Sequence, residues 1–220
     1  MTRKKKILAT RILGTIVIVS TAVAFALYAA LHVLRPDYNP ARRFLSEYAV
    51  GPFGALMTLE FFVQALIALS LALGLFLEVR RSRSLMVGCL LLAVSAVTAV
   101  MLGLFPGDLS DPSGGAPRLV THSGAIHQFA GTLSFVFRAV AFLLLPRAYR
   151  EDGQWQAFAG TAHGVGMAFL LLFLAFLAAV RWDLGGLAQR AAVAVGLVWF
   201  FLNGLQLRQG LDQPLHPAAP

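Results

Sequence analysis

The sequence predicts an all-α bundle of six transmembrane helices. Six long apolar stretches alternate with short charged loops, and each stretch reaches the roughly 20 residues that a helix needs to cross a hydrocarbon core of about 30 Å. Of the 220 residues, 58% are hydrophobic and 13% are charged, which is typical of a chain whose surface faces lipid. Because backbone groups in lipid must be hydrogen-bonded, and because the stretches are too long and continuous for barrel strands, each is expected to be a helix.

The predicted spans form one domain over residues 1–208. Basic residues before the first span resemble the start of a signal peptide, but the apolar run is about twice the usual length of such a peptide's apolar region. An uncleaved anchor is therefore predicted. The proline-rich segment 209–220 is expected to be a disordered tail. The spans are placed near residues 10–34, 53–78, 84–105, 123–145, 157–180 and 187–207.

Particular residues within and beside the spans agree with this division. Tyr149, Trp155 and Trp182 fall at span ends, where a belt of interfacial aromatic residues is expected. Gly160 and Gly164 in the fifth span form a small-xxx-small pair, which favours close helix packing or dimerisation. A homo-oligomer is thus left open. Since the chain has 1 cysteine, neither a disulfide pair nor a cysteine-based zinc motif is expected.

The distribution of positive charge predicts the orientation. With the N-terminus in the cytoplasm, 11 Lys and Arg residues lie in inner segments and six in outer segments, so both termini are expected to be cytoplasmic, in the inner membrane. The net charge of +8 gathers at alternate helix ends rather than on one face, which argues against nucleic acid and leaves the lipid bilayer as the expected partner.

Polar residues expected in the outer half of the bundle form the main candidate site. Glu60 and Gln64 lie one turn apart on the second span, and His127 lies on the fourth. Ionisable groups are costly in the bilayer, so such residues are expected to face the bundle interior with a partner. The remaining members are His32 at the end of the first span and the loop residues Ser46, Glu47, Asp108, Asp111 and His122.

This outer group leaves several kinds of chemistry open. Carboxylates and imidazoles at similar depth could bind a divalent metal, relay protons or hold a polar head group. His122 and His127 are five residues apart, unlike the i, i+4 pair of a helical zinc site, unless His122 precedes the helix. The alternative is structural: His32 and His122 as interfacial residues with polar tips in the head-group zone, and His127 as a neutral imidazole bonded to a neighbouring helix.

An inner polar group is predicted from Arg138, His163, Asn203 and Gln206. On the fourth span His127, Gly131, Ser134 and Arg138 follow the helical period and draw one polar stripe down a single face. Arg138 either pairs with Glu60, the one carboxylate away from the ends of the predicted spans, or extends to the cytoplasmic phosphates. Bis-histidine haem is disfavoured, because His127 and His163 are expected in different leaflets.

Several short motifs resemble the bacterial and archaeal membrane family known as domain of unknown function 998. They are Leu34-Arg35-Pro36, Ser46-Glu47-Tyr48 followed by Gly51 and Gly54, Gly103-Leu104-Phe105-Pro106-Gly107-Asp108, and His127. The resemblance covers nearly the whole chain and implies a six-span protein of uncharacterised activity, with no established catalytic residues. It also implies that Ser46, Glu47, Asp108 and His127 gather on the outer side.

Three function classes follow from these observations. The favoured class is a non-enzymatic protein that binds or passes a small ligand through the outer polar pocket. The second is a metal-dependent intramembrane lipid hydrolase, in which His122, His127, Asp108 and Glu47 hold the metal and its water attacks. The third is electron transfer through b-type haem. A purely structural or assembly role is also open.

Overall fold

The computed structural model describes residues 2–109 and 120–209, and helices account for most of that part of the chain. Six helices are long and apolar enough to cross a membrane, and the described residues include no strand, so the predicted all-α fold is confirmed. Asp111 and residues 210–220 lie outside the described part. The helices are α1 (Arg3–Leu34), α2 (Gly54–Glu78), α3 (Arg83–Leu104), α4 (His122–Arg150), α5 (Gln156–Ala179) and α6 (Gly185–Gln209).

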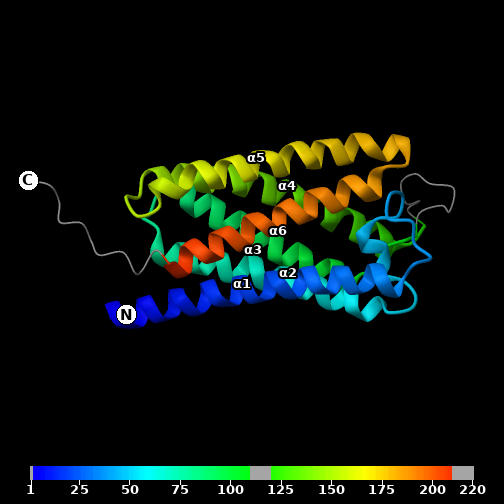
Figure 1. Ribbon diagram of the computed structural model, residues 1–220, viewed down its shortest axis with the longest axis horizontal. Helices are drawn as coiled ribbons and strands as arrows, with labels where there is room; N and C mark the ends of the chain where they lie inside the picture. The colour runs from blue at the N-terminus through cyan, green and yellow to red at the C-terminus, as the bar shows by residue number, and fades with distance from the viewer. Residues whose placement is uncertain (1, 110–119, 210–220) are drawn as a thin grey trace, which may run out of the picture.

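The six helices form one elongated bundle in which each helix packs against the next in the chain (Figure 1). The last helix, α6, closes the ring by packing against α1, and it also contacts α2. The start of α1 and the end of α6 lie at the same end of the bundle (Figure 1). The opposite end, here called the η1 end, carries the short 3-10 helices η1 (Leu45–Ala49) and η2 (Val180–Trp182).

Glycines set the closest helix crossings. A Cβ atom on Gly14 of α1 would lie 3.0 Å from the carbonyl oxygen of Gly204 on α6. A Cβ atom on Gly166 of α5 would lie 2.6 Å from the carbonyl oxygen of Phe142 on α4. Small residues let helix backbones approach in this way. By contrast, Gly160 and Gly164 face open space on the exposed side of α5, so the bundle itself does not use that pair.

The fourth helix extends beyond its expected end at residue 145. It continues through Pro146 to Arg150, and Ala148 and Tyr149 in its last turn are buried. Proline removes the hydrogen bond to the carbonyl four residues earlier, which here belongs to Phe142. The backbone of α5 approaches this same carbonyl at Gly166. Tertiary packing around the freed carbonyl accounts for a helix that tolerates an internal proline.

Aromatic residues predicted for the interfacial belt divide into two groups. Trp182 is 70% exposed at the η1 end, as a belt residue would be. Trp155 is only 1% exposed and packs against Tyr149, with ring centroids 4.8 Å apart. Tyr149 donates a hydrogen bond of 2.7 Å to Asn203 Oδ1. These two residues therefore join α4, α5 and α6 inside the bundle rather than facing lipid.

Candidate functional site: an internal cavity at Arg138

A buried polar network connects α1, α2 and α4. Gln64 donates from Nε2 to both carboxylate oxygens of Glu60, at 2.8 and 3.0 Å, and to the Tyr28 hydroxyl at 2.8 Å. Glu60 is completely buried, and Gln64 and Tyr28 are nearly so. The spacing of Glu60 and Gln64 places both on one face of α2, as the sequence predicts. The network thus fixes the amide plane of Gln64.

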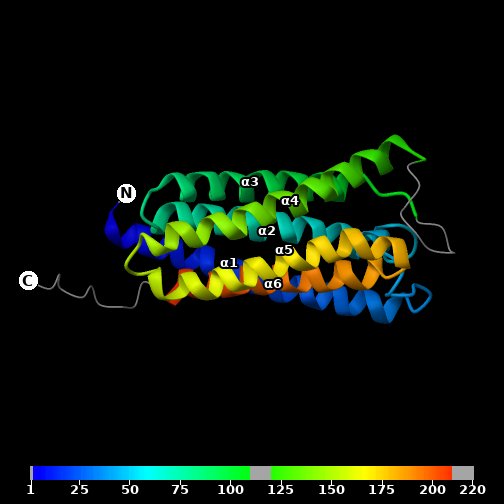
Figure 2. The ribbon, with the colours of Figure 1, turned by 90° about the horizontal axis from the view of Figure 1, so that it is seen from above.

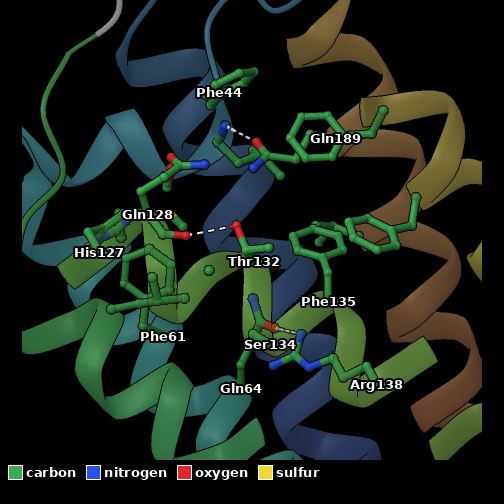
Figure 3. A pocket seen from close by; sticks show the side chains of 18 of the residues that line it. Phe44, Phe61, Gln64, His127, Gln128, Thr132, Ser134, Phe135, Arg138 and Gln189 are labelled. Atoms are coloured by element: carbon green, nitrogen blue, oxygen red, sulfur yellow. Dashed lines mark hydrogen bonds between the residues drawn. The ribbon is translucent and has the colours of Figure 1, made fainter. Parts of the chain in front are cut away.

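Arg138 completes the network from α4. Its Nη1 donates to Oε1 of Gln64, on the opposite side of the amide from the bonds to Glu60 (Figure 3). Among the described residues, Arg138 makes no direct ion pair with a carboxylate, and its buried Nε has no hydrogen-bond partner. A guanidinium offers five N–H donors in a planar fork. Arg138 therefore has donor capacity that the described protein groups do not use.

Arg138 lies at one end of an internal cavity of about 200 Å³. Figure 3 shows Arg138 and Gln64 at one end of this cavity, and Phe44 and Gln189 at the other. Side chains with polar tips and large aromatic rings share the lining. The polar members are Ser46, Gln64, His127, Gln128, Thr132, Ser134, Arg138 and Gln189, and the aromatic members are Tyr28, Phe44, Phe61, Phe135, Phe173 and Phe176.

Three phenylalanines form the apolar wall between α4 and α5. The Phe135 ring stacks on Phe173 with centroids 5.2 Å apart and is tilted against Phe176 at 5.8 Å. Such pairs add to the stability already gained by burying the rings. The wall is therefore a firm surface that would accept an apolar group beside the charged end.

The η1 segment covers the end of the cavity opposite Arg138. The Leu45 backbone N–H donates to Oε1 of Gln189 at 2.7 Å, and the Leu187 N–H donates to the Ala41 carbonyl at 3.1 Å. A Cβ atom on Gly186 would lie 2.4 Å from the Arg43 carbonyl oxygen, so α6 and this loop approach closely. These contacts hold Leu45 and Ser46 against the cavity.

Two predicted carboxylate ligands have structural partners instead. Glu47 accepts a hydrogen bond from the Phe44 N–H at 3.1 Å and pairs with Arg43 at 2.8 Å. Asp108 accepts from the backbone of Val120 and Thr121 and from the Thr121 hydroxyl, at 2.9 to 3.0 Å. The backbone hydrogen bonds to Asp108, above all from Thr121, hold the pKa of its carboxyl below the ordinary value.

Two of the three predicted outer histidines, His127 and His122, lie in different surroundings. His127 donates from Nδ1 to the Phe105 carbonyl at 2.8 Å and meets the Phe61 ring edge-on, while it lines the cavity. In a neutral ring this bond leaves Nε2 as the acceptor. His122 is the first residue of α4 and is exposed, and Thr121 caps the helix before it.

A second, much smaller cavity lies beside His127, at about 10 Å³. It brings together four residues that the sequence predicted for the outer site, namely Ser46, Glu47, Asp108 and His127. Within residues 2–109 and 120–209, no group of three or more His, Cys, Asp or Glu side chains is placed to hold a metal ion. The space is small, and the hydrogen bonds of Glu47 and Asp108 are already directed to the backbone and to Arg43.

The structure arranges the predicted inner group differently. Arg138 bonds to Gln64 and so joins Glu60. Asn203 instead accepts from Tyr149 and donates to the Trp199 carbonyl at 2.8 Å, while His163 is half-buried on α5.

Sequence reasoning did not select several residues of the site. Tyr28, Gln128, Thr132 and Gln189 all line the cavity. Tyr28 lies one turn before His32 on α1, a spacing that places both on one helix face and could have identified it. Nothing in the sequence indicated Gln189, because its partner is a backbone N–H 144 residues away.

Six helices of transmembrane length around an internal polar cavity define a multi-pass membrane protein. The chain belongs to the family described as "Protein of unknown function (DUF998)", whose model matches residues 18–206. The resemblance seen in the short motifs is thereby confirmed. No curated protein and no solved structure gives a significant match to the chain.

Proposed function

We propose that this protein binds a small ligand with a negatively charged group in the cavity, and that Arg138 binds the charge. The observation that carries the proposal is a guanidinium at the cavity that donates to Gln64, has a buried Nε without a partner, and makes no direct ion pair among the described residues. A carboxylate or phosphate matches the geometry of a guanidinium and can accept two of its N–H groups at once.

The electrostatic cost of Arg138 supports an anionic ligand. A charged side chain at mid-bilayer costs about 2.5–3.5 kcal/mol even on lenient insertion scales, so it is usually paired. Gln64 lies between Glu60 and Arg138, so Glu60 offsets the positive charge without contacting it directly. An anion in the cavity would supply a direct partner on the side of Arg138 that Gln64 does not occupy.

The remaining polar lining suits the rest of such a ligand. Gln128, Thr132 and Gln189 offer amide and hydroxyl groups along the cavity, and Ser46 lies at the η1 end. We place both termini in the cytoplasm, on the basis of the positive charges, which puts the η1 end outside. Binding of the ligand, or its passage across the membrane, would then begin from the outer half.

The test is a binding titration on protein purified in an uncharged detergent. We expect a small carboxylate such as benzoate to bind, and the matched amide benzamide to bind much more weakly. Arg138→Gln should abolish benzoate binding, whereas Arg147→Gln, an exposed arginine on the same helix, should not. Unchanged benzoate binding by folded Arg138→Gln protein would refute the proposal.

A further inference from the structure

We infer that the ligand is an amphipathic anion, with one alkyl chain on a carboxylate or phosphate, that enters from the bilayer through an opening between α4 and α5. This inference rests on the proposed anion site and adds the chemical class and the route. The two helices diverge toward the η1 end (Figure 2), in the half of the bundle that holds the cavity.

Residues of the cavity lining reach the outer surface at this divergence. Gln128 and Thr132 on α4 line the cavity and are also exposed. On the facing side, Leu177 of α5 lines the cavity and is 50% exposed. A residue that is both lining and exposed marks the place where the cavity meets the surroundings. Here these residues belong to the two helices that separate.

The surface around this opening is apolar and therefore suited to lipid. Phe129 on α4, and Leu171 and Leu174 on α5, are all large exposed hydrophobic residues. Thr132 satisfies its hydroxyl by donating to the Gln128 carbonyl at 2.9 Å, which lowers the cost of placing it at a lipid-facing gap. Acyl chains would thus contact the rim of the opening.

From the inside outward, the cavity presents first the charge of Arg138, then the apolar wall, then the opening. An amphipathic anion that enters with its charged group first would match this order. Arg138 lies six residues along α4 from Thr132, or about 9 Å at 1.5 Å per residue. Phe135, at the midpoint of this path, forms the apolar wall with Phe173 and Phe176. A head group at Arg138 would leave its alkyl chain against these rings and toward the gap.

Access from water at the η1 end is more restricted. Phe44, Leu45 and Gln189 cover that end, and the bond from the Leu45 N–H to Gln189 ties the covering segment to α6. A solute from water would have to displace these contacts. A molecule dissolved in the bilayer meets the gap between α4 and α5 directly.

The experiment compares binding of six probes in an uncharged detergent: decanoate, decyl phosphate, decanol, decylamine, acetate and inorganic phosphate. We expect decanoate or decyl phosphate to bind at least about tenfold more tightly than acetate or inorganic phosphate, because the alkyl chain is buried. Decanol and decylamine should bind weakly, since neither offers Arg138 an anion. Which of the two decyl anions binds better distinguishes a fatty acid from a lipid phosphate.

A blocking variant tests the route. Thr132→Phe should slow decanoate association at least about tenfold, since a ring would fill the gap. Thr161→Phe, the same change at an exposed position of α5 outside the cavity lining, should leave the association rate unchanged. Gln128→Trp provides a second block at the same rim if Thr132→Phe fails to fold, with folding judged by size-exclusion chromatography and circular dichroism.

The outcomes separate this inference from the proposed function. If acetate or benzoate binds through Arg138 as tightly as decanoate, the anion site stands and the amphipathic class is overturned. If decanoate associates with the folded blocking variants as fast as with the unmodified protein, the route is overturned. If no anion binds with dependence on Arg138, both proposals fail together.

Discussion

Arg190 Nε donates a hydrogen bond of 2.7 Å to Nε2 of His32, which joins α6 to the end of α1. The other ring nitrogen of His32 bonds to the Tyr28 carbonyl at 2.7 Å. Since Nε2 accepts, the ring is neutral with its proton on Nδ1. Arg190 also donates to the carbonyls of Pro40 and Arg43, at 2.8 and 2.6 Å. This pair therefore holds the loop after α1, which covers the cavity.

Replacing His32 should destabilise the bundle. His32→Ala leaves Arg190 Nε without its acceptor in a partly buried site, and we expect a loss of about 1–3 kcal/mol in the free energy of unfolding. Thermal unfolding in detergent measures this loss. The control is His122→Ala at an exposed position, where a change within about 0.5 kcal/mol is expected. Equal stability of the two variants would contradict this role for the Arg190–His32 bond.

The backbone before α4 should become less firmly held at acidic pH, because the Asp108 carboxylate that accepts its hydrogen bonds becomes protonated. Hydrogen bonds to the carboxylate keep the pKa of Asp108 in the folded protein below the ordinary 3.8. The Asp108 carboxylate therefore stabilises the folded protein fully when the pH is above the ordinary pKa. This stabilisation is lost as the pH falls through the lower pKa that Asp108 has in the folded protein. Asp108→Asn should show the looser start at neutral pH, because one acceptor oxygen is replaced by a donor.

Hydrogen exchange at the Val120 and Thr121 amides, which Asp108 accepts from, measures that loosening. The Gln154 amide, which donates to Asp152 at 3.0 Å, serves as an internal control in the same sample. Faster exchange of the first two amides alone is the expected result of Asp108→Asn. If all three change together, the effect is global and the local role of Asp108 is refuted.

Removing the charge of Glu60 should strengthen anion binding at Arg138. Glu60→Gln keeps an oxygen that accepts from Gln64 but removes a negative charge from the network. At an effective dielectric constant of about 20 and a separation of about 10 Å, the relief of repulsion is about 1–2 kcal/mol, or roughly tenfold in affinity. A benzoate titration measures the change, with Glu78→Gln at the other end of α2 as the control. Weaker benzoate binding by Glu60→Gln would contradict the assignment of the anion to Arg138.

Two glycines on α5 should respond oppositely to alanine. Gly166→Ala places a Cβ atom against the Phe142 carbonyl, so α4 and α5 must separate, and we expect a loss of about 1–3 kcal/mol. Gly160→Ala meets nothing within 4 Å, and the better helix propensity of alanine should leave stability unchanged or raise it by up to about 1 kcal/mol. Denaturant unfolding of the two variants makes the comparison.

Cysteine labelling tests the orientation. In a Cys89→Ala background, Asn39→Cys at the η1 end should react with a membrane-impermeant maleimide added to intact cells, because that loop is expected outside. Arg81→Cys, in the loop at the other end, should react only after the membrane is opened. Both positions are exposed on the protein. The reverse pattern would invert the proposed topology.

The sequence by itself determined the six helices, because the hydrophobic length that lipid demands is a local property of the chain. It also marked Glu60, Gln64, His127 and Arg138 as residues that must face inward, since their burial cost in lipid does not depend on the fold. Only the tertiary structure decided their partners. Gln64 separates Arg138 from Glu60, and Asp108 accepts hydrogen bonds from the backbone just before α4. These contacts between distant segments depend on helix rotation and tilt. Those angles are set by packing, such as the approach of Gly166 to Phe142, which hydropathy does not encode.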